Sequence, residues 1–167
     1  MRAVVNARTR SVSDRATAAL LRETYLEPSS QSDPFVCDLN GIEQLSPDAA
    51  DELVGKFVLR LRDQRPDAVV FIIGRTDDVL GKVHAALRDR RQAAWGINER
   101  ESPNEWIALG DINDADREAL SRFAQGARDD PAFEALVTKG LLRRGADGYT
   151  PPVLPEPEWE PVATASV

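Results

Sequence analysis

The chain has 167 residues, 42% of them hydrophobic, which is enough for one domain with a buried core. It carries 21 Lys and Arg against 28 Asp and Glu, and this net charge of -7 argues against binding along a phosphate backbone. The single cysteine, Cys37, excludes an intrachain disulfide, and one Cys with one His is too few for a common zinc site. We therefore expect neither a metal ion nor another cofactor.

The sequence has no apolar run of membrane-spanning length, and its N-terminus lacks the apolar stretch of a signal peptide. Frequent Arg and Ala with few Lys are typical of a GC-rich bacterial genome. We therefore expect a bacterial, cytoplasmic protein that does not contact membranes.

The first predicted elements are a helix, a loop and a strand. Residues 10–26 carry apolar side chains at helical spacing, and Ser11 or Ser13 can cap this helix. The stretch 27–34 is rich in Pro and Ser, which is typical of a loop. Residues 35–42 alternate between two faces and predict a strand.

A second helix is predicted from Ser46 onward. Ser46 is a suitable N-cap, Pro47 suits the first helical position, and Asp48 faces the positive end of the helix dipole. Pro66 follows the helix end. The apolar stripe that identifies this helix consists of Ala50, Leu53, Val54, Phe57, Val58 and Leu61.

The middle of the chain continues the alternation of strands and helices. The apolar run 68–74 predicts a strand buried on both faces, and Thr76 can cap the helix that follows. Residues 93–97 and 105–110 predict two short strands. This order predicts an α/β fold, with a mixed, mainly parallel sheet connected by crossover helices.

The pattern changes after the last of these strands. Asn113 or Asp111 can cap one helix, and a second helix is predicted from Pro131 to Gly140, where Gly140 suits a left-handed C-cap. Residues 145–148 can close a small hairpin. We therefore predict a small C-terminal segment of helices and a hairpin.

This organisation divides the chain into a domain at 1–110, an appendage at 111–152 and a tail rich in Pro and Glu at 153–167. Two interpretations of the appendage stay open: a helical cap on the sheet, or a winged-helix-like DNA-binding segment. In the second case, Arg143 and Arg144 would contact phosphates.

Residues 35–90 resemble a STAS domain, the fold of bacterial anti-sigma-factor antagonists. The shared pattern is a strand ending in Asp-Leu-x-Gly-Ile (38–42), a short loop, a helix with a polar start, a buried strand and another helix. The chain is most similar to a STAS-like family of unassigned function, whose typical Ser-x-Ser-Phe-Ala-Asp-Glu-Leu segment corresponds here to 46–53. The resemblance covers roughly residues 8–92.

The resemblance implies a regulator that binds a partner kinase, an ATPase of histidine-kinase-like fold. In anti-sigma-factor antagonists, the partner phosphorylates a serine at the helix start, and the phosphate disrupts docking. Asp48 stands at that position here, so this chain departs from the serine switch.

Two interpretations of the helix start stay open. Plain helix capping explains Ser46 and Pro47, whereas Asp48, Asp51 and Glu52 together exceed what capping requires. No nucleophile–base pair or phosphate loop is evident, so we expect no enzymatic activity. We expect a regulatory domain that docks on a protein through residues 45–55, using Ser46 and the three acidic residues. The alternative is a transcriptional regulator that binds DNA through its C-terminal segment.

Overall fold

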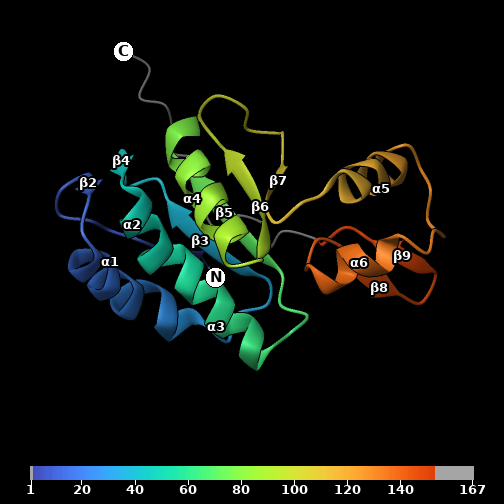
Figure 1. Ribbon diagram of the computed structural model, residues 1–167, viewed down its shortest axis with the longest axis horizontal. Coiled ribbons are helices and arrows are strands. Elements are labelled where there is room, and N and C mark those ends of the chain that lie inside the picture. The colour runs from blue at the N-terminus through green and yellow to red at the C-terminus, as the bar shows by residue number, and fades with distance from the viewer. Residues whose placement is uncertain (1, 153–167) are drawn as a thin grey trace, which may run out of the picture.

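The computed structural model describes residues 2–152 and shows an α/β chain organised around a five-stranded sheet (Figure 1). The strand order is β1-β3-β5-β6-β7, and only the last pair, β6 with β7, is antiparallel. This confirms the predicted α/β class and its mainly parallel sheet. The strands are β1 (Arg2–Val4), β3 (Phe35–Leu39), β5 (Val70–Gly74), β6 (Ala93–Asn98) and β7 (Ile107–Gly110).

The helical segments before β7 pack on one face of the sheet (Figure 1). Two of them, η1 and η3, are single π-helical turns that continue α1 and α2. These segments are α1 (Arg15–Leu21), η1 (Arg22–Leu26), the 3₁₀ turn η2 (Glu27–Ser29), α2 (Pro47–Ala50), η3 (Asp51–Gly55), α3 (Lys56–Gln64) and α4 (Asp77–Asp89).

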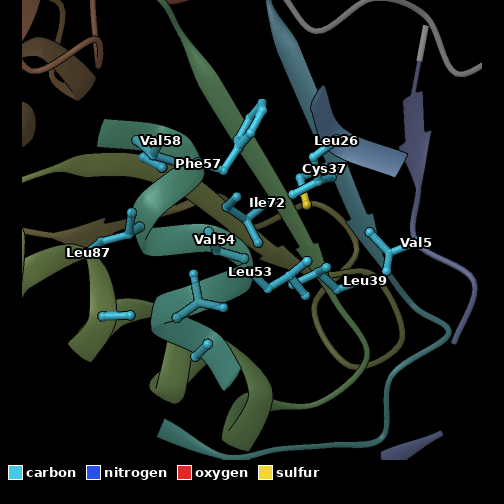
Figure 2. Packing of buried hydrophobic residues seen from close by; sticks show 14 of the residues in the cluster. Val5, Leu26, Cys37, Leu39, Leu53, Val54, Phe57, Val58, Ile72 and Leu87 are labelled. Carbon is cyan, nitrogen blue, oxygen red and sulfur yellow. The ribbon is translucent and has the colours of Figure 1, made fainter. Parts of the chain in front are cut away.

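The main hydrophobic core lies between these helices and the sheet (Figure 2). Cys37 and Leu39 of β3 and Ile72 of β5 face the apolar stripe of η3 and α3, as the alternation of side chains along β3 predicts. Phe57 lies with its ring centroid 4.6 Å from that of Phe35. Each such buried side chain stabilises the fold by roughly 1.5–3 kcal/mol.

β5 is the central strand, and all five of its residues are buried. Its continuous apolar character follows from this position, since each face of a central strand meets a hydrophobic layer. The face of the sheet opposite α1 to α4, called the second face below, carries a separate cluster. Its members are Val36, Val69, Phe71, Ile73 and Ile97, with Trp95 and Trp106 packed against them.

The predicted caps are partly confirmed. Ser46 and Thr76 each accept a hydrogen bond from the backbone N–H three residues on, which starts α2 and α4. The first helix differs from the prediction, because Asp14 caps it and Ser11 lies in a strand. Asp14 takes the cap because its carboxylate accepts from both the backbone N–H and the hydroxyl of Thr17.

Three short strands were not predicted. β1 adds an edge strand to the main sheet, and β2 (Ser11–Val12) pairs in parallel with β4 (Gln44–Leu45). Strands of two or three residues are too short to show a period of two, so only tertiary pairing reveals them.

The C-terminal appendage contains two helices and a hairpin, and these pack on the β6–β7 end of the second face. Asn113 caps the first helix in a reciprocal capping box, and Gly140, with φ +73°, follows the second helix. Trp95 Nε1 donates to the Leu141 carbonyl at 3.1 Å, which ties the appendage to the sheet. These elements are α5 (Asp114–Ala124), α6 (Phe133–Thr138), β8 (Arg143–Gly145) and β9 (Gly148–Thr150).

The tail at 153–167 lies outside the described residues. Among residues 2–152, none of the helices has both the length and the apolar character needed to cross a membrane.

Candidate functional site

Ser46 lies at the start of α2, and its hydroxyl group makes two hydrogen bonds. Its Oγ accepts from the Ala49 N–H at 3.1 Å and donates to the Ser13 carbonyl at 2.9 Å. The first bond satisfies one of the unpaired N–H groups of the helix start. Ser46 therefore fixes the turn, and a modification of its hydroxyl would disturb both contacts.

Asp48 is the most exposed of the four predicted docking residues, with 73% of its side-chain surface accessible. Within residues 2–152 it forms one ion pair, with Arg15 of α1, at 3.2 Å between Oδ1 and Nη2. An exposed pair of this length contributes at most about 1 kcal/mol, so it holds the carboxylate only weakly. Asp48 thus presents its charge to solvent beside the positive end of α2.

Asp51 is engaged by two arginines. Arg90, the C-cap of α4, donates through Nε to Oδ1 at 2.6 Å and through Nη2 to Oδ2 at 3.0 Å. Arg15 donates to Oδ2 at 3.0 Å. The hydrogen bonds from Arg90 and then Arg15 lower the pKa of Asp51 from 3.8 to about 2, against the opposing effect of burial. The carboxylate therefore stays ionised and joins η3 to α1 and α4.

Glu52 is buried, with 6% of its surface exposed. Lys56 contacts its Oε2 at 2.5 Å, and Arg22 Nη1 donates to its Oε1 at 2.8 Å and to its carbonyl at 2.7 Å. The hydrogen bond from Lys56 and then that from Arg22 lower the pKa of Glu52 from 4.5 to about 2. Because Arg22 lies in η1 and Glu52 in η3, this pair joins the two π-helical turns.

The three acidic residues of this segment, Asp48, Asp51 and Glu52, therefore fall into two groups. Asp51 and Glu52 stabilise the packing of the helices through ion pairs within the chain. Only Asp48 faces solvent, where it can meet a partner. Of the four residues, Ser46 and Asp48 lie at the start of α2, and Asp51 and Glu52 follow in η3.

A hollow of about 500 Å³ opens beside Asp48, between the start of α2 and one side of α4. Charged side chains of both signs surround it: Arg15, Asp48, Lys82, Asp89 and Arg90. Sequence reasoning missed the basic members of this set, because Arg90 is 39 residues away from its partner Asp51 along the chain. The surface can complement a charged protein partner, since both signs are available for pairing.

The arginines proposed for DNA binding are paired with carboxylates. Arg143 contacts Asp33, and Arg144 Nε donates to Glu134 Oε1 at 2.9 Å. Tyr149 also donates its hydroxyl to Glu134. Of the three helices of a winged-helix segment, the described appendage contains two, α5 and α6.

Cys37 and His84 also carry side chains that could react, and the surroundings of both indicate structural roles. Cys37 is buried in the core, and burial raises the pKa of its thiol. His84 Nδ1 accepts from the Gly110 N–H at 2.9 Å, and burial lowers its pKa. Among residues 2–152, His, Cys, Asp and Glu side chains form no group of three that could hold a metal ion.

In comparison with known proteins, no family model, curated protein or solved structure matches the chain.

Proposed function

We propose that this chain is a STAS-like, non-enzymatic regulatory domain of the bacterial cytoplasm, which docks on a protein partner through residues 45–55. The observation that carries the proposal is the exposed carboxylate of Asp48, at the start of α2 and beside a hollow lined by both charges. The partner implied by the resemblance is an ATPase of histidine-kinase-like fold.

The ionisation of the acidic residues supports docking over catalysis. Asp51 and Glu52 have pKa values of about 2 and are surrounded by cations. A general acid or base works best with a pKa near the operating pH, so neither carboxylate is suited to proton transfer at pH 7.

Asp48 distinguishes this proposal from the serine switch of anti-sigma-factor antagonists. Its charge of about -1 is permanent at neutral pH, whereas a phosphoserine adds about -1.5 to -2 only when a kinase has acted. We therefore propose a constitutively charged docking edge. Its binding is steered by exposed charges and weakens as salt rises.

Affinity purification from the native cell tests the proposal, with wild type and Asp48→Lys as baits. Asp114→Lys is the matched control, because Asp114 is also an exposed acidic residue in the first turn of a helix and also pairs with an arginine. We expect wild type and the control to retain a kinase-like ATPase that Asp48→Lys loses. Equal recovery of that partner by all three baits would contradict the proposal.

A further inference from the structure

Arg62, near the end of α3, is a buried cation with no carboxylate partner in the described part of the chain. It keeps 8% of its surface exposed. Its Nε donates to the Ala68 carbonyl at 3.2 Å and its Nη1 donates to Gln92 Oε1 at 3.3 Å, and both acceptors are neutral. Burial lowers the pKa of Arg62 from 12.5 to about 10, so the guanidinium still carries its charge at pH 7. The fold therefore holds a desolvated charge without an opposite charge beside it.

The third nitrogen of this guanidinium, Nη2, lies at the contact with the appendage. Within residues 2–152 it is buried and has no hydrogen-bond acceptor. Gly140, which follows α6, lies against it, since a Cβ on Gly140 would be 2.7 Å from Nη2. The appendage thus helps to cover Nη2 but offers it no acceptor. A buried donor that loses water and gains no partner costs free energy, and more so when it is charged.

The contact between the appendage and the sheet is also incompletely packed. A hollow of about 490 Å³ lies between them, with Trp95 and Ile107 of the sheet on one side and Leu120 and Phe123 of α5 on the other. Protein interiors normally interdigitate with few voids, so the groups that line this hollow lose part of their dispersion contacts. The appendage is therefore held less tightly than an element of the main core.

The appendage has a hydrophobic cluster of its own. The ring of Phe133 meets those of Phe123 and Tyr149 edge-on, with centroids 5.6 and 5.5 Å apart. Most members of the cluster come from residues 112–149, and the members from the sheet are Ala93, Trp95 and Ala108. Most of these contacts would remain if the appendage left the sheet.

We propose that the appendage, residues 111–152, is a cover that opens away from the sheet as a unit, and that Arg62 sets how readily it opens. In the closed form Nη2 is dehydrated and unpaired, whereas in the open form water hydrates the guanidinium. The connection that allows the movement is the segment 111–113, between β7 and α5, where the chain leaves the sheet (Figure 1). This cover is separate from the docking proposed for residues 45–55.

Hydrogen exchange of the Trp95 indole N–H, followed by NMR in the full-length chain at pH 7, tests the proposal. The indole donates to the Leu141 carbonyl of the appendage, so its hydrogen exchanges whenever the cover opens. The backbone amide of Ile72, in the central strand, exchanges on unfolding of the whole domain. We expect the indole to be protected less than this amide, by about tenfold or more after correction for intrinsic rates. Equal protection would overturn the proposal, since the cover would then leave only on global unfolding.

Arg62→Met tests the role of Arg62 in the opening. Methionine is a flexible apolar side chain that leaves neither a charge nor a donor beneath Gly140. We expect this variant to favour the closed form, so that the Trp95 indole exchanges about tenfold more slowly. If Arg62 instead stabilised the closed form through its two hydrogen bonds, the indole would exchange faster in the variant. Faster or unchanged exchange would therefore overturn the proposal.

Arg60→Met is the matched control, because Arg60 also lies on α3 but has 59% of its side chain exposed and pairs with Glu27. We expect the control to leave the exchange of the Trp95 indole unchanged, and an equal slowing in both variants would overturn the role of Arg62.

If Arg62→Met does not fold, Gly140→Ala is the second test. The added methyl group would crowd Nη2 and the Ala68 carbonyl oxygen, and opening of the cover relieves this crowding. We expect the Trp95 indole to exchange faster in this variant, and an unchanged rate would overturn the proposal.

Discussion

Replacing Glu52 by Gln should destabilise the chain more than any other single change of charge within residues 45–55, the proposed docking turn. The amide keeps the volume of the side chain but removes the negative charge that meets Lys56 and Arg22. Arg22 is itself buried, with 4% of its surface exposed. The substitution therefore leaves a buried guanidinium without its closest carboxylate.

The expected loss is about 3 kcal/mol. The pKa of Glu52 falls from 4.5 to about 2 on folding, and each pKa unit corresponds to about 1.36 kcal/mol. Removal of one partner from a buried ion pair costs about 3–5 kcal/mol, which is the same range. Lys56, which contributes most to the shift, has 34% of its side chain exposed, so solvent screens part of this interaction and about 3 kcal/mol is the upper end of the expected loss.

Urea denaturation at pH 7 measures this loss, and in a chain of this size it corresponds to a melting temperature lower by about 6–12 °C. The contribution of Glu52 to the free energy of unfolding should decrease as the pH is lowered. A carboxylate with a lowered pKa stabilises the fold above pH 4.5, and the contribution disappears as the pH falls towards 2. The difference between wild type and Glu52→Gln should therefore narrow over that interval.

Glu23→Gln is the matched control, because Glu23 also faces Arg22 but lies 3.8 Å away with 60% of its side chain exposed. We expect the control to change stability by less than about 0.5 kcal/mol. A loss below about 1 kcal/mol for Glu52→Gln, with an unchanged acid profile, would refute the reasoning.

Three further predictions concern other parts of the fold. Gly140→Ala should lower the free energy of unfolding in urea by about 1–3 kcal/mol, because φ is +73° and a Cβ would lie 2.6 Å from the Ala68 carbonyl oxygen. Since burial lowers the pKa of His84, which accepts from the Gly110 N–H, wild type should lose stability as the pH falls below 6.5, and His84→Gln should not show this loss between pH 8 and pH 5. Cys37 should react with a thiol reagent only after denaturation, and rapid reaction of the native chain would contradict its burial.

Local patterns predicted much of the fold. The apolar stripe after Ser46 identifies a helix, because burial of one helix face repeats apolar residues at helical spacing. The continuous apolar run of β5 identifies a strand that is buried on both faces. The caps at Ser46 and Thr76 followed from chemistry confined to one helical turn.

The parts that sequence reasoning missed depend on distant partners. Arg22 and Glu52 are 30 residues apart, and neither position differs locally from an exposed residue of an amphipathic helix. Because the sequence does not reveal that Glu52 pairs with Arg22, Glu52 was predicted to be available for docking. Burial of a charge becomes visible only when the opposite charge is located.

The short pairing of β2 with β4 couples two regions thermodynamically. The Ser46 N–H donates to the Val12 carbonyl at 3.0 Å, and the Ser46 hydroxyl donates to the Ser13 carbonyl at 2.9 Å. Release of residues 10–13 would remove both acceptors, so α2 would lose its anchored cap although none of its own residues had changed. By reciprocity, a partner that bound residues 45–55, as proposed above, would stabilise the pairing of residues 10–13, and a ligand of residues 10–13 would change the affinity for that partner.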